Sequence, residues 1–249
     1  MKLPINLKPK FQYNLIRIGS KYDGGYLIEK NSILESEFLF SFGISTNWDF
    51  EKDFLKLNNI NFLAFDGSIN DDFWSLERKK ALIKIRKLSI SRIIDFYILK
   101  LSFDKFFNKR NFISKFISTK LDNSITFNEA ISLSSKKRLF FKIDIEGSEY
   151  EFLNDIIFHQ KKILGIVIEF HECRKWINKI INFVDNFSLE LVHIHANNYD
   201  LDSKMEIPNT LEITFAKNPR AIGNFKTLPH ILDSPNRAKN SEINLTFDE

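Results

Sequence analysis

Two acidic residues follow a short apolar run in the middle of the chain, within the segment Phe141–Glu149 (FKIDIEGSE). Such a run is typical of a buried parallel strand, and in open α/β sheets the carboxyl end of that strand borders a crevice where ligands bind. Asp144 and Glu146 would lie at this end. Because a carboxylate is costly to desolvate, an acid there usually has a partner or a chemical task. The alternative is an acid that caps the helix following the strand.

Two further pairs of polar residues repeat this spacing near the ends of predicted strands, Glu169/His171 and His193/His195. Residues i and i+2 of an extended chain point to the same side, so three strand ends would direct carboxylates and imidazoles into one crevice. We select His195 as the general base, since imidazole titrates near neutral pH. We expect Asp144 and Glu169 to be catalytic groups that orient this base, hold the substrate or bind a metal ion.

The other polar residues at these strand ends are candidates for substrate binding: Glu146, His171, His193, Asn197 and Asn198. The two asparagines can exchange hydrogen bonds with a polyhydroxylated substrate. The same carboxylates, imidazoles and amides also suit Mg²⁺ or Mn²⁺, so the sequence leaves a metal site and a general-base site both open. A histidine that only satisfies its own surroundings is the alternative at each position.

A nucleotide site is indicated by the turn after the first predicted core strand. Gly43 lies in this turn, and Asp66 follows 23 residues later at the end of the second predicted strand, where an acid suits hydrogen bonding to ribose hydroxyls. A dinucleotide site needs several glycines to meet a pyrophosphate, and this turn has one, which favours S-adenosylmethionine over NAD. The cofactor-binding candidates are Gly43, Ser45, Asp66, Gly67 and Ser68. A turn glycine and a surface acid are the alternative.

The elements that must position these residues alternate along the chain. The predicted core strands are residues 37–44, 61–65, 139–145, 163–170, 189–195 and 211–216, and the predicted helices include residues 50–57, 126–133 and 176–187. Nearly apolar strands alternating with helices indicate a single α/β domain with a mostly parallel sheet covered on both faces. An N-terminal extension (1–36) and a C-terminal tail (217–249) flank this domain.

Charge is unevenly distributed along the chain. The net charge is +4, yet residues 76–120 contain 13 Lys or Arg and three Asp or Glu. We expect this basic segment to be a largely helical elaboration near the crevice mouth that faces an anionic substrate. It could instead attract an anionic membrane or nucleic acid, or be a solvated helical face. Since it contains no recognised nucleic-acid motif, we predict no nucleic-acid partner.

Other features limit the class of protein. The single Cys173 excludes an intrachain disulfide and a cysteine-based zinc site. No apolar stretch approaches the roughly 20 residues needed to span a bilayer. Because the first residues also lack the apolar segment of a signal peptide, we expect a cytoplasmic protein without a transmembrane segment. The sequence leaves the oligomeric state open, a homodimer included.

The segment Lys142–Glu149 (KIDIEGSE) resembles the signature of FkbM-type S-adenosylmethionine-dependent methyltransferases. The resemblance extends to a bacterial branch of this family through Arg17–Gly19, Asp23–Tyr26, Ser41–Ile44, Phe50–Glu51, His193–Asn198 and Pro208–Thr214. It implies a class I methyltransferase fold, which is Rossmann-like: a mostly parallel seven-stranded sheet with an antiparallel last strand and helices on both faces.

The resemblance also implies O-methylation of a sugar hydroxyl. In this branch the sugar is often destined for a surface polysaccharide such as a capsule, and we expect it to be carried as a nucleotide-activated sugar, such as a heptose. Two other functions stay open from the sequence. One is an NAD-dependent nucleotide-sugar oxidoreductase or epimerase, and the other is a non-enzymatic module that binds a polyanion.

Overall fold

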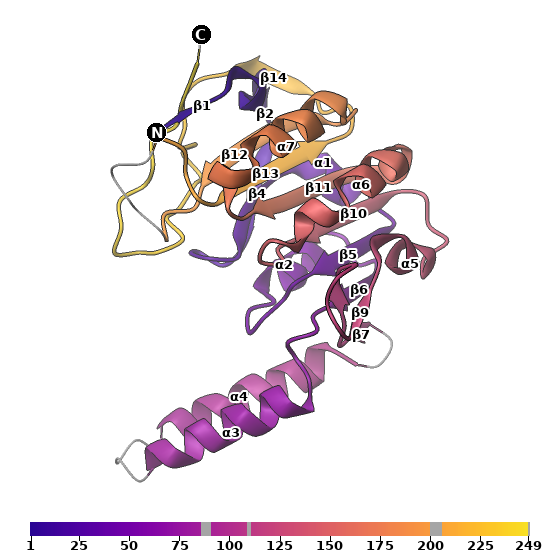
Figure 1. Ribbon diagram of the computed structural model, residues 1–249, viewed down its shortest axis with the longest axis vertical. Coiled ribbons are helices and arrows are strands. Elements are labelled where there is room, and N and C mark those ends of the chain that lie inside the picture. Colours follow the sequence, from indigo (N-terminus) through magenta and orange to yellow (C-terminus); the bar gives the residue numbers. More distant parts are fainter. Residues whose placement is uncertain (86–90, 109–110, 200–205, 249) are drawn as a thin grey trace.

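A seven-stranded sheet forms the centre of the molecule (Figure 1). The computed structural model describes residues 1–85, 91–108, 111–199 and 206–248. The strands of the sheet are β5 (Phe38–Phe42), β6 (Asn61–Phe65), β7 (Phe112–Ile113), β10 (Leu139–Ile143), β11 (Ile163–Phe170), β12 (Glu190–Ala196) and β13 (Leu211–Ala216). Their order is β12-β13-β11-β10-β5-β6-β7, and only β13 is antiparallel to its neighbours. This confirms the predicted sheet.

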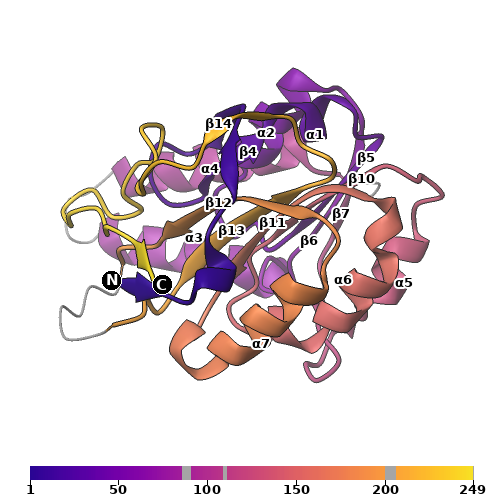
Figure 2. The same cartoon turned by 90° about the horizontal axis from the view of Figure 1, so that it is seen from above.

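Helices cover both faces of the sheet, as Figure 2 shows. One face carries α5 (Phe127–Ser132), α6 (Leu153–His159) and α7 (Cys173–Asn186), and the other carries α1 (Lys30–Leu34) and α2 (Asp49–Leu57). Short 3₁₀ turns occupy Ile5–Leu7, Ser148–Glu151 and Gln160–Lys162. Strand alternation divides the core accordingly: Phe40 and Phe141 pack toward α5–α7, whereas Leu39 and Phe140 pack with Phe54 of α2.

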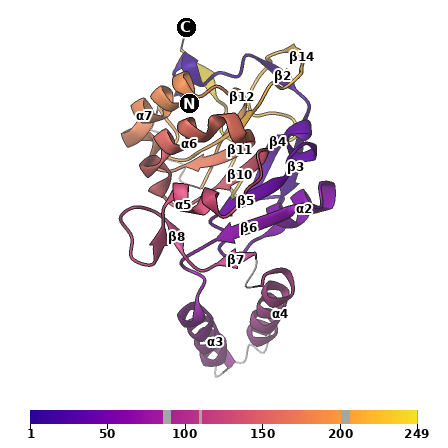
Figure 3. The ribbon, with the colours of Figure 1, turned by 90° about the vertical axis from the view of Figure 1, so that its right-hand side faces the viewer.

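The basic segment forms an arm of two helices, α3 (Asp71–Ile85) and α4 (Ser91–Phe106), inserted between β6 and β7. The arm extends away from the sheet (Figures 1 and 3). Its base is fixed by Phe103 and Phe107, whose rings pack against Trp48. Beyond it, the short strands β8 (Phe116–Ile117) and β9 (Ser124–Ile125) lead back to the sheet. Parts of the predicted basic segment, 86–90 and 109–110, lie outside the described residues.

The N-terminal extension and the C-terminal tail associate beside the β12 edge of the sheet. β1 (Lys2–Leu3) pairs with β15 (Thr246–Phe247), and β2 (Phe11–Tyr13) pairs with β14 (Ala221–Asn224). β3 (Leu15–Gly19) and β4 (Gly25–Glu29) form a hairpin, which includes the turn and strand expected near residues 22–28. Among the described residues, no helix has the length and apolarity required to cross a bilayer.

Candidate active site

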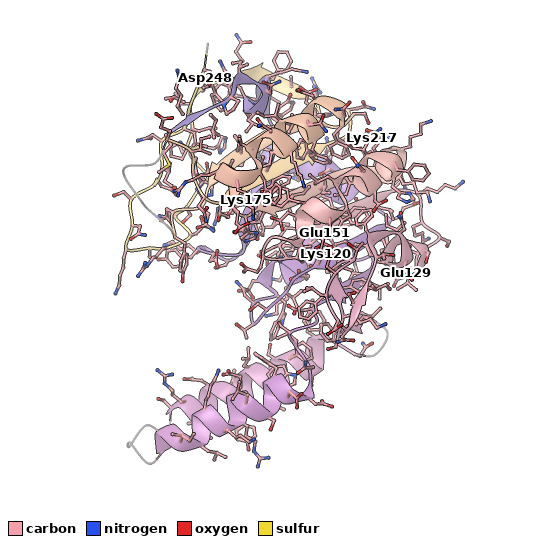
Figure 4. All side chains as sticks on the ribbon, viewed as in Figure 1. Lys120, Glu129, Glu151, Lys175, Lys217 and Asp248 are labelled. Carbon is pink, nitrogen blue, oxygen red and sulfur yellow. The ribbon has the colours of Figure 1, made fainter. Side chains whose placement is uncertain are left out.

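A cavity of about 460 Å³ lies at the carboxyl ends of β5, β6 and β10. Its lining includes four of the predicted cofactor-binding residues, Gly43, Ser45, Asp66 and Ser68, together with Asp144 and Glu146. A second wall comes from β8 and Leu121, and Glu151 anchors the chain between them by accepting hydrogen bonds from Ser118 and Thr119. Glu151 also lies 3.7 Å from Lys120 (Figure 4). A pocket of ligand size therefore lies at this edge of the sheet.

The turn after β5 touches the end of β10. Gly43 has φ +77°, and a Cβ built on it would lie 1.7 Å from the carbonyl oxygen of Asp144. Only glycine fits such a close backbone contact with a positive φ. Lys142 stabilises the same junction. Its buried ammonium donates a hydrogen bond to the Gly43 carbonyl and lies 3.4 Å from Asp144 Oδ2. The cavity floor is thus built from two adjacent strand ends.

Asp66 organises the cavity wall. Its Oδ2 accepts hydrogen bonds from the backbone N–H of Ile44 (3.0 Å) and Ser45 (2.8 Å), and its Oδ1 accepts from the N–H (2.9 Å) and Oγ (2.6 Å) of Ser68. The carboxylate therefore joins the turns after β5 and β6. Gly67 lies in the turn after β6, where a Cβ would collide with the ring of Phe116.

A row of polar side chains crosses the sheet at this edge. The strand register pairs Glu169 of β11 with Glu212 of β13, and Glu212 with His195 of β12. Asp144 follows Ile143, whose partner is Ile168, and so takes the corresponding place beside Glu169. The sequence-based expectation that strand ends would gather acids and imidazoles is met for Asp144, Glu169 and His171.

Asp144, Glu169 and His171 form the centre of this row. Each offers one ligand atom, and these atoms lie within 4.8 Å of one another. The hydroxyl of Tyr26 donates to Glu169 Oε2 (2.9 Å) and Asp144 Oδ2 (3.2 Å), and Asn197 Nδ2 donates to Glu169 Oε1 (3.0 Å). Burial, followed by the charges of Asp144 and Glu212, raises the pKa of Glu169 well above its usual value.

His171 is oriented by a buried acid. Glu149 Oε1 accepts a hydrogen bond from the His171 backbone N–H (2.7 Å) and lies 3.4 Å from its Nδ1. The other nitrogen, Nε2, lies 3.5 Å from Glu146 and 3.9 Å from oxygens of Asp144 and Glu169. Burial alone lowers the pKa of His171, but Glu149, Glu169 and Asp144 outweigh it and raise the pKa to about 9.

His195 lies in a separate cluster. Its Nδ1 is 3.0 Å from Glu212 Oε2 and its Nε2 is 3.1 Å from Glu242 Oε2, a residue of the C-terminal tail. Burial lowers the pKa of His195, but the two carboxylates outweigh it and raise the pKa to about 10. Because carboxylates engage both ring nitrogens of this buried imidazole, neither nitrogen is available to accept a proton from a substrate. The prediction that His195 is the general base is therefore withdrawn.

Two more of the selected residues hold the tail. His193 Nε2 is 2.9 Å from Asp233, and the buried Asn198 side chain donates to the carbonyls of residues 237, 240 and 241. Asn197 instead joins Glu169 to the chain after β12. Its Nδ2 donates to Glu169, and its Oδ1 accepts a hydrogen bond from the backbone N–H of Tyr199. Glu146, with 86% of its side chain exposed, lines the cavity while its carboxylate lies 3.5 Å from His171 Nε2.

The His195 cluster makes a pH-dependent contribution to stability. Because the folded-state pKa of about 10 exceeds the ordinary 6.5, this contribution is complete below pH 6.5 and is lost as the pH rises through 10. We expect His195→Gln to lower the free energy of unfolding by on the order of a few kcal/mol at pH 6 and by much less at pH 10. Urea unfolding at both pH values measures this, with His159→Gln on α6 as the control. An equal loss at both pH values would contradict it.

The strand order defines the fold class. From the centre of the sheet, β5, β6 and β7 follow one another toward one edge. Toward the other edge come β10, β11, the antiparallel β13 and then β12. This is the class I methyltransferase arrangement expected from the sequence. Tyr26, Lys142 and Glu149 are site residues that our selection missed, although all three lie within the motifs of the FkbM resemblance.

The solved structures to which this chain is similar include the following two. Precorrin-6y C5,15-methyltransferase from Geobacter metallireducens GS-15 is 14% identical, with a TM-score of 0.37 over 76% of this chain and 86% of that one. TYW2 from M. jannaschii, in complex with AdoMet, is 11% identical, with a TM-score of 0.33 over 83% of this chain and 88% of that one. No protein-family model and no curated protein matches the sequence. Membership of the FkbM family therefore stays a prediction.

Proposed function

We propose that the protein is an S-adenosylmethionine-dependent O-methyltransferase that acts on a hydroxyl of a sugar, carried as a nucleotide-activated sugar. The observation that supports this best is the junction of a nucleotide-sized cavity with an acid–imidazole cluster at the carboxyl edge of a class I methyltransferase sheet. The sulfonium of the cofactor is already a good leaving group. The protein must align the hydroxyl oxygen, methyl and sulfur, and remove the hydroxyl proton.

The cofactor would occupy the cavity beside Gly43, Ser45, Asp66 and Ser68. S-adenosylmethionine has no pyrophosphate, so one glycine at the turn after β5 is sufficient. Asp66 shapes this wall through its hydrogen bonds to both turns, and its place at the end of β6 suits the ribose.

Replacing Asp66 by alanine should weaken cofactor binding. The substitution leaves the N–H groups of Ile44, Ser45 and Ser68 without their acceptor and frees both turns. We expect a loss of roughly 1.5–3 kcal/mol in S-adenosylmethionine affinity, the range for hydrogen bonds to a charged group. Calorimetric titration of the folded variant measures it, and an unchanged affinity would remove Asp66 from the cofactor site.

The base in this proposal is Nε2 of His171. Glu149 accepts a hydrogen bond from the His171 backbone and places its carboxylate 3.4 Å from Nδ1, where its charge would stabilise the imidazolium that forms. Tyr26, Asp144 and Asn197 surround the same point and can hold neighbouring sugar hydroxyls. The tail closes this side, since Asn236 Nδ2 donates to Asp23 (3.3 Å) and Glu212 (2.5 Å).

The cluster also fits a divalent cation. Asp144, Glu169 and His171 supply two carboxylates and an imidazole. Mn²⁺ binds both kinds of ligand, whereas Mg²⁺ prefers the carboxylate oxygens. A bound cation would stabilise the negative charge that develops on the attacking oxygen. In that case His171 and Glu169 bind the metal, and Asp144 both binds it and holds the substrate.

One assay tests the function. The protein is incubated with methyl-labelled S-adenosylmethionine and a panel of nucleotide sugars, with the corresponding free sugars alongside. We expect label in a nucleotide sugar and an equal amount of S-adenosylhomocysteine. Reduction or epimerisation of the same sugars with NAD, and no methyl transfer, would contradict the proposal.

Metal dependence is read in the same assay. Loss of activity in EDTA, with recovery on adding Mg²⁺ or Mn²⁺, assigns Asp144, Glu169 and His171 to a cation. Full activity in EDTA assigns His171 to proton removal.

A further inference from the structure

The arm formed by α3 and α4 carries a stripe of apolar side chains on its outer surface. On α4 the stripe consists of Ile94, Tyr97, Ile98 and Leu101, which have the i, i+3, i+4, i+7 spacing of one helical face and are 48–67% exposed. The opposite face of α4, with Phe103, packs toward the base of the arm. Scattered exposed leucines need no explanation, but a continuous apolar stripe marks an interaction surface.

The outer end of the arm adds more apolar surface and a strong positive charge. Leu82 (46% exposed) and Ile83 (63% exposed) lie on α3. From Arg78 to Ile94 the sequence contains seven Lys or Arg and no Asp or Glu. Arg78, Lys79 and Arg92 are exposed in the described part of this range. Figures 1 and 3 show that the end of α3 and the start of α4 lie farthest from the sheet.

We propose that the arm binds the surface of an anionic lipid bilayer. The exposed isoleucine and leucine side chains would enter the boundary between headgroups and acyl chains, Tyr97 would lie at headgroup level, and the lysines and arginines would contact anionic headgroups. This inference is independent of methyl transfer, because no residue of the arm described above lines the cavity at the sheet edge.

Charge and side-chain type select this partner over two others. A second copy of the chain offers the same basic surface, so its arm is repelled where an anionic surface is attracted. Single-stranded nucleic acid is also a polyanion, but proteins bind its bases by stacking aromatic side chains on them. Among the arm residues whose side chains the structure describes, the exposed large apolar ones are aliphatic apart from Tyr97.

Vesicle co-sedimentation of the full chain tests the proposal. We expect at least tenfold tighter binding to phosphatidylcholine vesicles with roughly 30 mol% phosphatidylglycerol than to pure phosphatidylcholine, and weaker binding at high salt. Ile94→Ser with Ile98→Ser should reduce binding at least tenfold through lost apolar contact, and Arg78→Gln with Lys79→Gln about tenfold through lost charge. All four side chains are exposed, so circular dichroism and the melting temperature should not change.

Matched controls come from the body of the protein. Phe158→Ser removes an 80% exposed ring from α6, and Lys136→Gln with Lys137→Gln removes two exposed charges between α5 and β10. Both should bind anionic vesicles as the wild type does. Equal binding to both kinds of vesicle, or arm variants that behave as these controls, would overturn the proposal. Two other results would overturn it if vesicle binding is absent. One is a dimer in sedimentation equilibrium that becomes monomeric in the Ile94/Ile98 variant, and the other is binding to an RNA oligonucleotide.

Discussion

Replacing His171 by glutamine is expected to lower kcat for methyl transfer by about 10²–10⁴-fold, the usual contribution of a general base. S-adenosylmethionine affinity should not change, since His171 does not line the cofactor cavity. The pH profile adds a second signature. The base must be neutral and its pKa is about 9, so kcat/KM of the wild type should rise with pH and level off above 9. Initial rates across this range, with calorimetry for the cofactor, measure both effects.

Two variants make this prediction specific. Glu149→Gln removes the first acid that raises the pKa of His171, so the rise in kcat/KM should move to lower pH. His159→Gln, on the outer surface of α6, should keep the wild-type rate and profile. If His171→Gln retained the wild-type rate and the wild-type pH profile, His171 would not be the base.

Replacing Gly43 by alanine is expected to be the most damaging single change to the fold near the site. The added Cβ would lie 1.7 Å from the carbonyl oxygen of Asp144, and φ is +77°. Backbone atoms of two core strand ends cannot move apart cheaply, so we expect a loss of more than about 4 kcal/mol in the free energy of unfolding. Urea or thermal unfolding measures it, and cofactor binding should be lost in any protein that remains folded.

Gly147→Ala is the matched control. Gly147 has φ +104°, but a Cβ added there meets nothing within 4 Å. Its cost should be that of the backbone conformation alone, about 1–3 kcal/mol. If Gly43→Ala were as mild as Gly147→Ala, the turn after β5 would not press on the end of β10.

The core of the fold could be predicted because its strands are short apolar runs with clear ends. β6, β11 and β13 begin and end at the residues expected from the sequence, and Thr126 with Glu129 forms the predicted capping box of α5. β7 was not predicted, since it has two residues, Phe112 and Ile113. The outward direction of the arm could not be predicted either, because it depends on how Phe103 and Phe107 dock on Trp48.

The site was predictable to the extent that it is made by strand ends. Asp144, Glu169 and His171 lie at the ends of two adjacent parallel strands, so the periodicity of the chain brings them together. The role of His195 was not predictable, because Glu212 comes from an antiparallel strand and Glu242 from the tail. Tyr26 reaches the cluster from a hairpin outside the main sheet, where spacing along the sequence carries no information about contact.

The central claim is that the cavity at the ends of β5, β6 and β10 holds S-adenosylmethionine beside the Asp144–His171 cluster. Calorimetric titration of the wild-type protein with S-adenosylhomocysteine and with NAD tests it most directly. The predicted result is one-to-one binding of S-adenosylhomocysteine and no heat from NAD, since the turn at Gly43 lacks the glycines that a pyrophosphate requires. Binding of NAD without binding of S-adenosylhomocysteine would contradict the account.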